Sequence, residues 1–200
     1  QSWLYHADIF TIVLKFLGVR QPIFWAVRNS TLDNSSNNLV LRLMVGVLAR
    51  VSRNVPAGIS FNSYASKRHH TEQGYEPTKC TIIRNGFCAA NFQNPNSALI
   101  SQSMKLQQDF VVGMLCRPHP QKGIDFFLSG IAKIESLGLP VQFLLAGPTL
   151  DQEGHYSNLA KSYGLKSIKF EGAYSDPRKF YAKLDVFALT SLYGESFPNV

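Results

Sequence analysis

Three short loops in the second half of the chain carry side chains and glycines suited to an anionic ligand. Each follows an apolar segment with a strand pattern; the loops are Arg117-Pro-His-Pro-Gln-Lys-Gly123, Gly147-Pro148 and Ser191–Val200. In open α/β sheets, ligands bind beyond the carboxyl ends of the strands, so these loops are the first place to look for a site. Taken singly, each loop also fits a plain role, because charged loops are often only solvated and strand-ending glycines are often only turns.

The first loop places two cations around a proline-stiffened turn, ahead of a predicted helix. Free N–H groups at the start of a helix already favour an anion. Arg117 offers a planar fork of donors and Lys122 a point charge, a pair that suits a diphosphate. His119 lies between them and is a further candidate for contact with the same ligand.

The other two loops offer close backbone approach and a carboxylate. Gly147 ends an apolar strand, where the missing side chain lets a ligand come near the backbone. Glu195 stands in a loop punctuated by Gly and Pro after the last apolar strand, where a carboxylate can accept hydrogen bonds from hydroxyl groups. Alone, neither loop decides the ligand.

The elements that must position these loops alternate between helix and strand. Apolar spacing predicts helices over 2–18, 39–53, 63–73, 123–137, 152–163 and 176–184, and strands over 23–27, 58–61, 80–83, 110–115, 141–145, 167–170 and 185–189. A polar stretch over 86–108 is predicted to be a linker that ends in a helix near 96–106. The alternation is typical of parallel βαβ units, so we expect an α/β fold.

Charge divides the chain in two. The net charge of +7 belongs wholly to residues 1–105, with 11 Lys and Arg against 4 Asp and Glu, whereas residues 106–200 hold 9 of each. This division predicts two units with different partners. No basic motif with interleaved aromatic residues supports a nucleic-acid binder. The sequence also shows no signal peptide pattern and no apolar run near the ~18 residues that a membrane span needs.

Cysteine usage and absent motifs exclude further classes of site. Cys80, Cys88 and Cys116 form no C-x-x-C pair and have no His at metal-ligand spacing, so we expect no disulfide or zinc site and a reducing cytoplasm. The G-x-G-x-x-G motif of dinucleotide-dependent dehydrogenases is missing. Because the chain starts at Gln1 and stops at Val200 without terminal signals, we expect an internal fragment of a longer protein.

The order of the loops resembles the C-terminal domain of the glycosyltransferases of family 4, which are retaining, use nucleotide sugars and have the GT-B fold. That family's pattern runs G-x-x-x-R, four residues, K-G, then L-x-G, F-x-G, D-V-F and S-x-x-x-E-x-F-P-N-V. Its counterparts here are Gly113 to Arg117, Lys122-Gly123, Leu145-Ala-Gly147, Phe170-Glu-Gly172, Asp185-Val-Phe187, Ser191 and Glu195-Ser-Phe-Pro-Asn-Val200. The stretches Trp3–Asp8, Ile59–Ser63 and Ile82–Gly86 resemble the later part of the N-terminal domain in the same enzymes. The resemblance implies two incomplete Rossmann-like domains, over 1–105 and 106–200.

The resemblance also implies roles for single residues. Arg117 and Lys122 would bind the donor's diphosphate and stabilise the departing nucleotide, so that neither a metal nor a cofactor is needed. Glu195 would contact the transferred sugar as the first glutamate of an E-x7-E motif, whose second member falls past Val200. The implied donor contacts also include Gly113, Gly147, Phe197, Asn199 and Val200.

The implied reaction moves a sugar from a nucleotide-diphosphate sugar to a glycan or lipid-linked acceptor with retention of anomeric configuration. His6, Asp8 and Arg28 could line the acceptor side, with helix capping or core packing as the alternative. Two rivals remain open at this point. One is a non-catalytic GT-B subunit that binds a sugar nucleotide or a partner, and the other is a GT-B epimerase or phosphorylase.

Two further groups of side chains lie on predicted helices of the first half. Arg42, Arg50 and Arg53 share a polar face that could meet anionic lipid head groups, which would place a cytoplasmic enzyme at the inner membrane face. A solvated face is the alternative. His69 and His70 are expected on a solvated face of the helix over 63–73.

Overall fold

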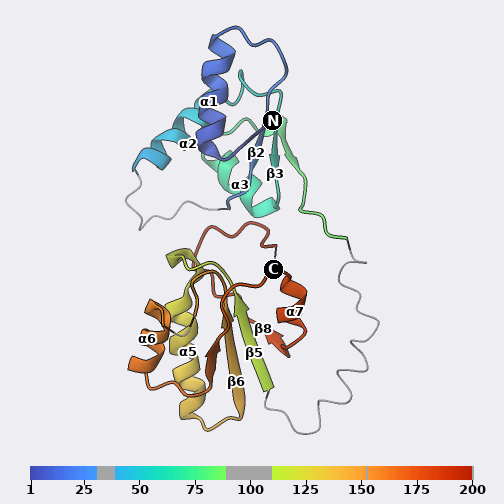
Figure 1. Ribbon diagram of the computed structural model, residues 1–200. Coiled ribbons are helices and arrows are strands. Elements are labelled where there is room, and N and C mark those ends of the chain that lie inside the picture. The colour runs from blue at the N-terminus through green and yellow to red at the C-terminus, as the bar shows by residue number, and fades with distance from the viewer. Residues whose placement is uncertain (31–38, 89–109, 152, 200) are drawn as a thin grey trace. The chain divides into compact units, whose positions relative to one another are not determined.

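The computed structural model describes residues 1–30, 39–88, 110–151 and 153–199. Contacts divide the chain into two compact units, Gln1–Gly86 with Tyr193–Val200, and Phe87–Leu192. Each unit holds a four-stranded parallel sheet with helices, which confirms the predicted α/β fold (Figure 1). The predicted boundary near residue 105 lies outside the described residues, and the segment from Tyr193 onward groups with the first unit.

In the first unit the strands follow one another in chain order. They are β1 (Ser2–Trp3), β2 (Phe24–Val27), β3 (Gly58–Phe61) and β4 (Cys80–Ile82). The connections contain α1 (Tyr5–Phe16), α2 (Leu39–Val51), α3 (Tyr64–Glu72) and a 3-10 turn, η1 (Pro77–Lys79). Right-handed crossovers in this order place successive helices on one face of the sheet. Figure 1 shows α1 and α2 together on one side of β2 and β3.

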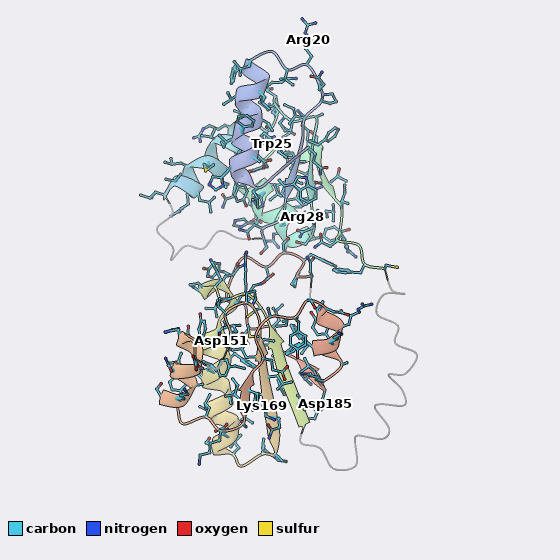
Figure 2. The ribbon with its side chains drawn as sticks, in the orientation of Figure 1. Arg20, Trp25, Arg28, Asp151, Lys169 and Asp185 are labelled. Carbon is cyan, nitrogen blue, oxygen red and sulfur yellow. The ribbon has the colours of Figure 1, made fainter. Side chains whose placement is uncertain are left out.

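Alternate residues of the strands build the core of the first unit, as the period of two in a strand requires. The buried cluster contains Tyr5, Trp25, Val27, Val45, Leu48, Ile59, Phe61 and Tyr75. Trp25, labelled beside α1 in Figure 2, is wholly buried and donates from Nε1 to Thr11 Oγ1 at 2.9 Å. The hydrogen bond satisfies the polar end of an otherwise apolar side chain.

The second unit has the strand order β7-β6-β5-β8. Its elements are β5 (Phe110–Leu115), the 3-10 turn η3 (Pro120–Lys122), α5 (Ile124–Ser136), β6 (Val141–Ala146), α6 (His155–Ser162), β7 (Ile168–Phe170), α7 (Pro177–Tyr181) and β8 (Val186–Phe187). The chain winds outward from β5 to β7 and then returns to pair β8 with the other side of β5. The order therefore reverses at β5, and ligands of open α/β sheets bind at such a switch point.

Helices cover both faces of the second sheet. Phe143 and Leu145 of β6 share a core with residues of α5 and α6 such as Leu128. The alternate residues Leu144 and Ala146 pack instead with Phe180 of α7. This two-sided burial explains the nearly continuous apolar sequence of β6.

The predicted elements agree closely with the observed ones, with small differences at the ends. The apolar pattern predicted a helix from residue 2, whereas β1 forms there and α1 begins at Tyr5, after a left-handed Leu4 (φ 76°). The helix expected near 96–106 lies outside the described residues. Within the described ranges, no helix has the length and apolar content to cross a membrane.

Candidate functional site

The loop between β5 and α5 is shaped by its prolines and by His119. The Nδ1 atom of His119 accepts the Gln121 N–H at 3.2 Å, and the His119 carbonyl accepts the Lys122 N–H at 2.8 Å. His119, a candidate ligand contact, therefore caps the turn η3. Gly123 then adopts a left-handed conformation (φ 62°) and starts α5, whose first N–H groups lack partners inside the helix.

The same loop is fixed to the segment that follows β8. Thr190 Oγ1 donates to the carbonyls of Lys122 (2.9 Å) and Gly123 (3.1 Å). The Leu192 N–H donates to the Gln121 carbonyl at 2.8 Å. The loops after β5 and β8 thus form one hydrogen-bonded structure at the switch point, and Lys122 is held in it by its backbone.

Arg117 and Lys122 bring positive charge to the two joined loops. Arg117 is exposed, whereas Lys122 is partly buried. Burial raises the pKa of the Cys116 thiol to about 11, and the charge of Lys122 opposes that rise. Cys116 is therefore a neutral thiol at physiological pH, and it does not compete with an anionic ligand for the two cations.

Two glycines allow the loops at this edge to approach one another. A Cβ at Gly147 would lie 1.7 Å from the Cys116 carbonyl oxygen. A Cβ at Gly123 would lie 2.3 Å from the Thr190 carbonyl oxygen. Real Cβ atoms do not reach such distances, so only glycine permits this backbone arrangement. The predicted contact between Gly147 and the donor stays a prediction beside this packing role.

Gly113 and Asp185 join β5 to β8 and α7. A Cβ at Gly113, inside β5, would lie 2.3 Å from Leu184 Cδ2 and 3.0 Å from Phe180 Cζ. Asp185, labelled in Figure 2, accepts the Val111 N–H through Oδ2 at 2.9 Å. The structure thus gives Gly113 a packing role, and its donor contact stays a prediction.

The segment around Glu195 belongs to the first unit and rests on polar residues that follow successive strands. Ser30, after β2, donates its N–H to the Gly194 carbonyl at 3.4 Å and its hydroxyl to the Glu195 carbonyl. These bonds hold the backbone at Glu195 in place.

Asn62 and Ser63 hold the next residue of the segment. The Ser196 hydroxyl donates to Oδ1 of the buried Asn62. Since that proton is used, the Ser63 hydroxyl donates to Ser196 Oγ at 2.8 Å. Ser63 Oγ also accepts the Ser66 N–H at 3.1 Å as the cap of α3, so the helix start and the segment share one side chain.

Asn85, after β4, holds the end of the segment. Its Nδ2 donates to the Phe197 carbonyl (3.1 Å) and to Asn199 Oδ1 (2.8 Å), while its Oδ1 accepts from Arg28 Nη1. The Arg28 guanidinium lies 4.8 Å from the centre of the Trp3 ring. We call Ser30, Asn62, Ser63 and Asn85 the clasp.

Comparisons with known proteins agree with this geometry. Residues 109–200 match the model of a family described as glycosyl transferases group 1. The fold matches that of the GT-B glycosyltransferases. Anabaena HepE in complex with UDP and glucose superposes with a TM-score of 0.76 at 21% identity, over 98% of this chain and 53% of that chain.

Two further proteins are similar to this chain, one in structure and one in sequence. TarM of S. aureus has a TM-score of 0.68 at 14% identity, over 90% of this chain and 35% of that chain. The glycogen synthase of Mycoplasma mobile is 28% identical over 148 residues, which is 66% of this chain and 30% of that protein. The chain thus spans about half of the HepE chain and smaller shares of the other two.

The predicted acceptor-side residues of this GT-B fold differ in exposure. His6 is exposed on α1, and Arg28, labelled in Figure 2, is exposed after β2. Asp8 is wholly buried, and its Oδ1 accepts from Ser2 Oγ at 2.5 Å. Burial raises the pKa of the Asp8 carboxyl to about 6. Asp8 is therefore part of the core, which was the alternative to a place on the acceptor side.

His70 corrects the expectation of a solvated histidine face. It is 1% exposed, its Nε2 accepts from the Tyr5 hydroxyl at 2.7 Å, and its Nδ1 donates to the Ser66 carbonyl at 2.8 Å. Burial lowers the pKa of His70 to about 4, so the ring is neutral. The polar composition of α3 concealed an inner face formed by Ser66 and His70, four residues apart.

Most of the predicted donor residues lie in two groups. Arg117, Lys122 and Gly147 lie at the carboxyl edge of the second sheet. Glu195, Phe197 and Asn199 lie in the segment that the clasp residues hold by hydrogen bonds. Val200 lies outside the described residues. Among the residues that the structure describes, no cluster of three or more His, Cys, Asp or Glu could hold a metal ion. No role was predicted for the residues of the clasp. Its members Ser30, Asn62 and Asn85 are polar residues just after apolar strands, the same signal that identified Arg117.

Proposed function

We propose that the protein is a glycosyltransferase that moves a sugar from a nucleotide-diphosphate sugar to a glycan or lipid-linked acceptor, with retention of anomeric configuration. The observation that carries the proposal is the switch point at β5, where a loop with two cations meets the segment after β8. The match of residues 109–200 to group 1 glycosyl transferases supports it. HepE structures contain UDP or UDP-glucose, so a uridine donor is the first to test.

Arg117 and Lys122 would act on the leaving group. As the bond between the anomeric carbon and the phosphate oxygen breaks, negative charge grows on the diphosphate. The Arg117 fork, the Lys122 ammonium and the N-terminus of α5 offer fixed positive charge at that place. Fixed cations of this kind can take the electrostatic role that a metal ion has in other transferases, and the donor serves as substrate, without a cofactor.

Glu195 and its neighbours would bind the sugar. The Glu195 carboxylate would accept hydrogen bonds from sugar hydroxyls, and the N–H groups of Phe197 and Asn199 would contact the sugar or phosphate, whereas Pro198 has none to offer. In the retaining reaction the acceptor oxygen bonds to the anomeric carbon on the face that the diphosphate leaves. The acceptor's proton passes to an oxygen of the departing phosphate.

We infer that the reaction takes place in a reducing compartment such as the cytoplasm. Cys80, Cys88 and Cys116 are all free thiols in the structure, although Cys88 is exposed. Reducing conditions keep exposed thiols in that form. We further propose that the exposed Arg42 and Arg50 bring the protein to an anionic surface at the inner membrane face.

A panel of nucleotides and nucleotide sugars tests the proposal on the full-length protein. We expect one nucleoside diphosphate, UDP or GDP, to raise the Tm by about 5 °C at about 100 times its Kd. The matching nucleotide sugar should then glycosylate an acceptor, and NMR of the product should show the donor's anomeric configuration. Absence of any nucleotide effect would contradict the proposal, and an inverted product would contradict retention.

A further inference from the structure

The turn that follows β6 has a strained residue at its third position. The Leu150 N–H donates to the Gly147 carbonyl at 3.1 Å, which closes the turn. Pro148 stands at the second position, and Thr149 at the third has a φ of 56°. A positive φ at the third position marks a type II turn, in which glycine or asparagine normally takes this place. Threonine is β-branched, and its backbone rarely adopts this conformation.

Nothing in the described part of the chain accounts for a threonine at this position. The other described residues with a positive φ are Leu4 and eight glycines, among them Gly123 after β5 and Gly172 after β7. Thr149 is exposed, and its side chain forms no hydrogen bond with any residue that the structure describes. Glycine would therefore relieve the strain at Thr149 without loss of a hydrogen bond inside the protein.

Hydrogen bonds on both sides hold the turn in its strained conformation. The Gly147 N–H donates to the Gly172 carbonyl at 2.7 Å, and the Gly172 N–H donates to the Leu150 carbonyl at 2.8 Å. On the other side the Cys116 N–H donates to the Ala146 carbonyl at 2.9 Å, next to the close approach of Gly147 to the Cys116 carbonyl. Strained backbone persists where the surrounding structure fixes it, and it clusters at functional sites.

The turn lies at the end of an inner strand of the second sheet. β6 pairs with β5 on one side and with β7 on the other, so no strand from elsewhere in a longer chain can pair with it. β8 pairs with the opposite side of β5. Asp151, the residue directly after the turn, is labelled in Figure 2.

This strand order indicates which part of the donor comes near Thr149. In the proposed function, on which this inference rests, the segment after β8 binds the sugar and the loop after β5 binds the diphosphate. The nucleoside is the other end of the donor. It then lies over the loops that follow β6 and β7, on the side of β5 opposite β8.

We propose that Thr149 is a donor-binding residue whose hydroxyl forms a hydrogen bond with the nucleoside of the nucleotide sugar. A hydroxyl can donate to or accept from the polar groups of the ribose and the base, whereas glycine, the unstrained choice here, has no side chain to do so. The strained turn lowers the stability of the free protein, and the hydrogen bond raises its affinity for the donor.

Two substitutions in the full-length protein separate the strain from the hydroxyl. Thr149→Val keeps a β-branched side chain of nearly the same shape and removes the hydroxyl. Its Tm should equal that of wild type, and calorimetric titration should show about tenfold weaker binding of the nucleoside diphosphate, UDP or GDP. Thr149→Gly should weaken binding by the same factor and raise the Tm by about 2 °C, because it removes the strain.

A control variant and a second ligand sharpen the test. Thr81 is exposed on β4, where valine fits a strand, so Thr81→Val should bind the nucleotide as wild type does. The corresponding nucleoside monophosphate should lose the same factor as the diphosphate in Thr149→Val, because the two ligands share the nucleoside.

The possible failures are distinguishable. A Thr149→Val protein with the nucleotide affinity of wild type would overturn the inference and leave the proposed function intact. A Thr149→Gly protein without a gain in Tm would overturn the strain on which the inference depends, and unequal losses for the two nucleotides would overturn the contact with the nucleoside. Wild-type protein that binds no nucleoside diphosphate would contradict the proposed function and the inference together.

Discussion

At the scale of single residues, Asn85 of the clasp holds the end of the segment that contains Glu195. Its amide donates to the Phe197 carbonyl and to Asn199 and accepts from Arg28. Loss of two donated hydrogen bonds should cost about 1–3 kcal/mol of positioning, so Asn85→Ala should lower kcat/KM about 10- to 100-fold while the Tm falls little. Steady-state kinetics of the proposed transfer reaction on the full-length protein measures this.

Asn158→Ala is the matched control for Asn85→Ala. Asn158 is exposed on α6, where alanine is a good helix former, so its kcat/KM should equal that of wild type. An Asn85→Ala enzyme within twofold of this control would show that the clasp does not position the site.

Asp8 makes the stability depend on pH. Its pKa is raised by burial from 3.8 to about 6, so the folded state binds the proton more tightly than the unfolded state. The resulting stability is fully present below the unfolded pKa and is lost as the pH rises through about 6. Asp8→Asn, which keeps the acceptor for Ser2, should therefore stabilise the protein by on the order of 2–3 kcal/mol at about pH 8.

The gain from Asp8→Asn should shrink towards zero near about pH 4. The lowered pKa of His70 has the opposite effect, since its stability is present above 6.5 and lost as the pH falls towards 4. The two groups offset each other in wild type, and acid destabilisation should become visible in the variant. Urea midpoints across this range measure both effects. A gain independent of pH would contradict the burial of an ionised Asp8.

Some single residues could be assigned a role from the sequence, whereas others could not. Arg117, Lys122 and Glu195 could be proposed from the sequence because they are charged residues that follow apolar strands. Asp8 and His70 could not be placed, since burial depends on which strands and helices pack around them. The Tyr5 hydroxyl that satisfies His70 comes from a position 65 residues away in sequence.

At the scale of elements, backbone approach at the carboxyl edge of the second sheet depends on glycine. Gly147→Ala would bring a Cβ to 1.7 Å from the Cys116 carbonyl oxygen. The β5 and β6 ends would have to separate, so we expect a loss of about 3–5 kcal/mol, measured as a lower Tm and urea midpoint.

Gly130→Ala tests the specificity of that effect. Gly130 lies within α5 with no atom near the site of its missing Cβ. Alanine in a helix should stabilise by about 0.5–1 kcal/mol, the opposite sign. Equal effects of the two substitutions would mean that the close contact at Gly147 is not required.

Elements were the part of the fold best predicted from sequence. The helical period of α5 and the nearly continuous apolar run of β6 identify these two elements. The two-residue β1 was missed because two residues carry no period. The turn η3 was anticipated only as a proline-stiffened turn, and the local hydrogen bond from the Gln121 N–H to His119 Nδ1 was not predicted.

At the scale of the whole molecule, the order β7-β6-β5-β8 creates the switch point on which the proposed function rests. Local patterns predict that strands and helices alternate, but they do not state which strands are neighbours. The expected GT-B fold came from a series of motifs, and the observed topology agrees with it. The pairing of the Glu195 segment with the first unit was not predicted, because it depends on contacts across more than 100 residues of sequence.

The central claim is that Arg117 and Lys122 bind the diphosphate of a nucleotide-sugar donor. Calorimetric titration of UDP and GDP into the full-length protein tests it most directly. We expect one nucleotide to bind wild type, and Arg117→Ala with Lys122→Ala to weaken binding by about 100-fold or more, since two charge-assisted contacts are lost. The control pair Lys133→Ala with Lys161→Ala, exposed on α5 and α6, should bind as wild type. Equal affinity of the Arg117/Lys122 variant and wild type would contradict the account.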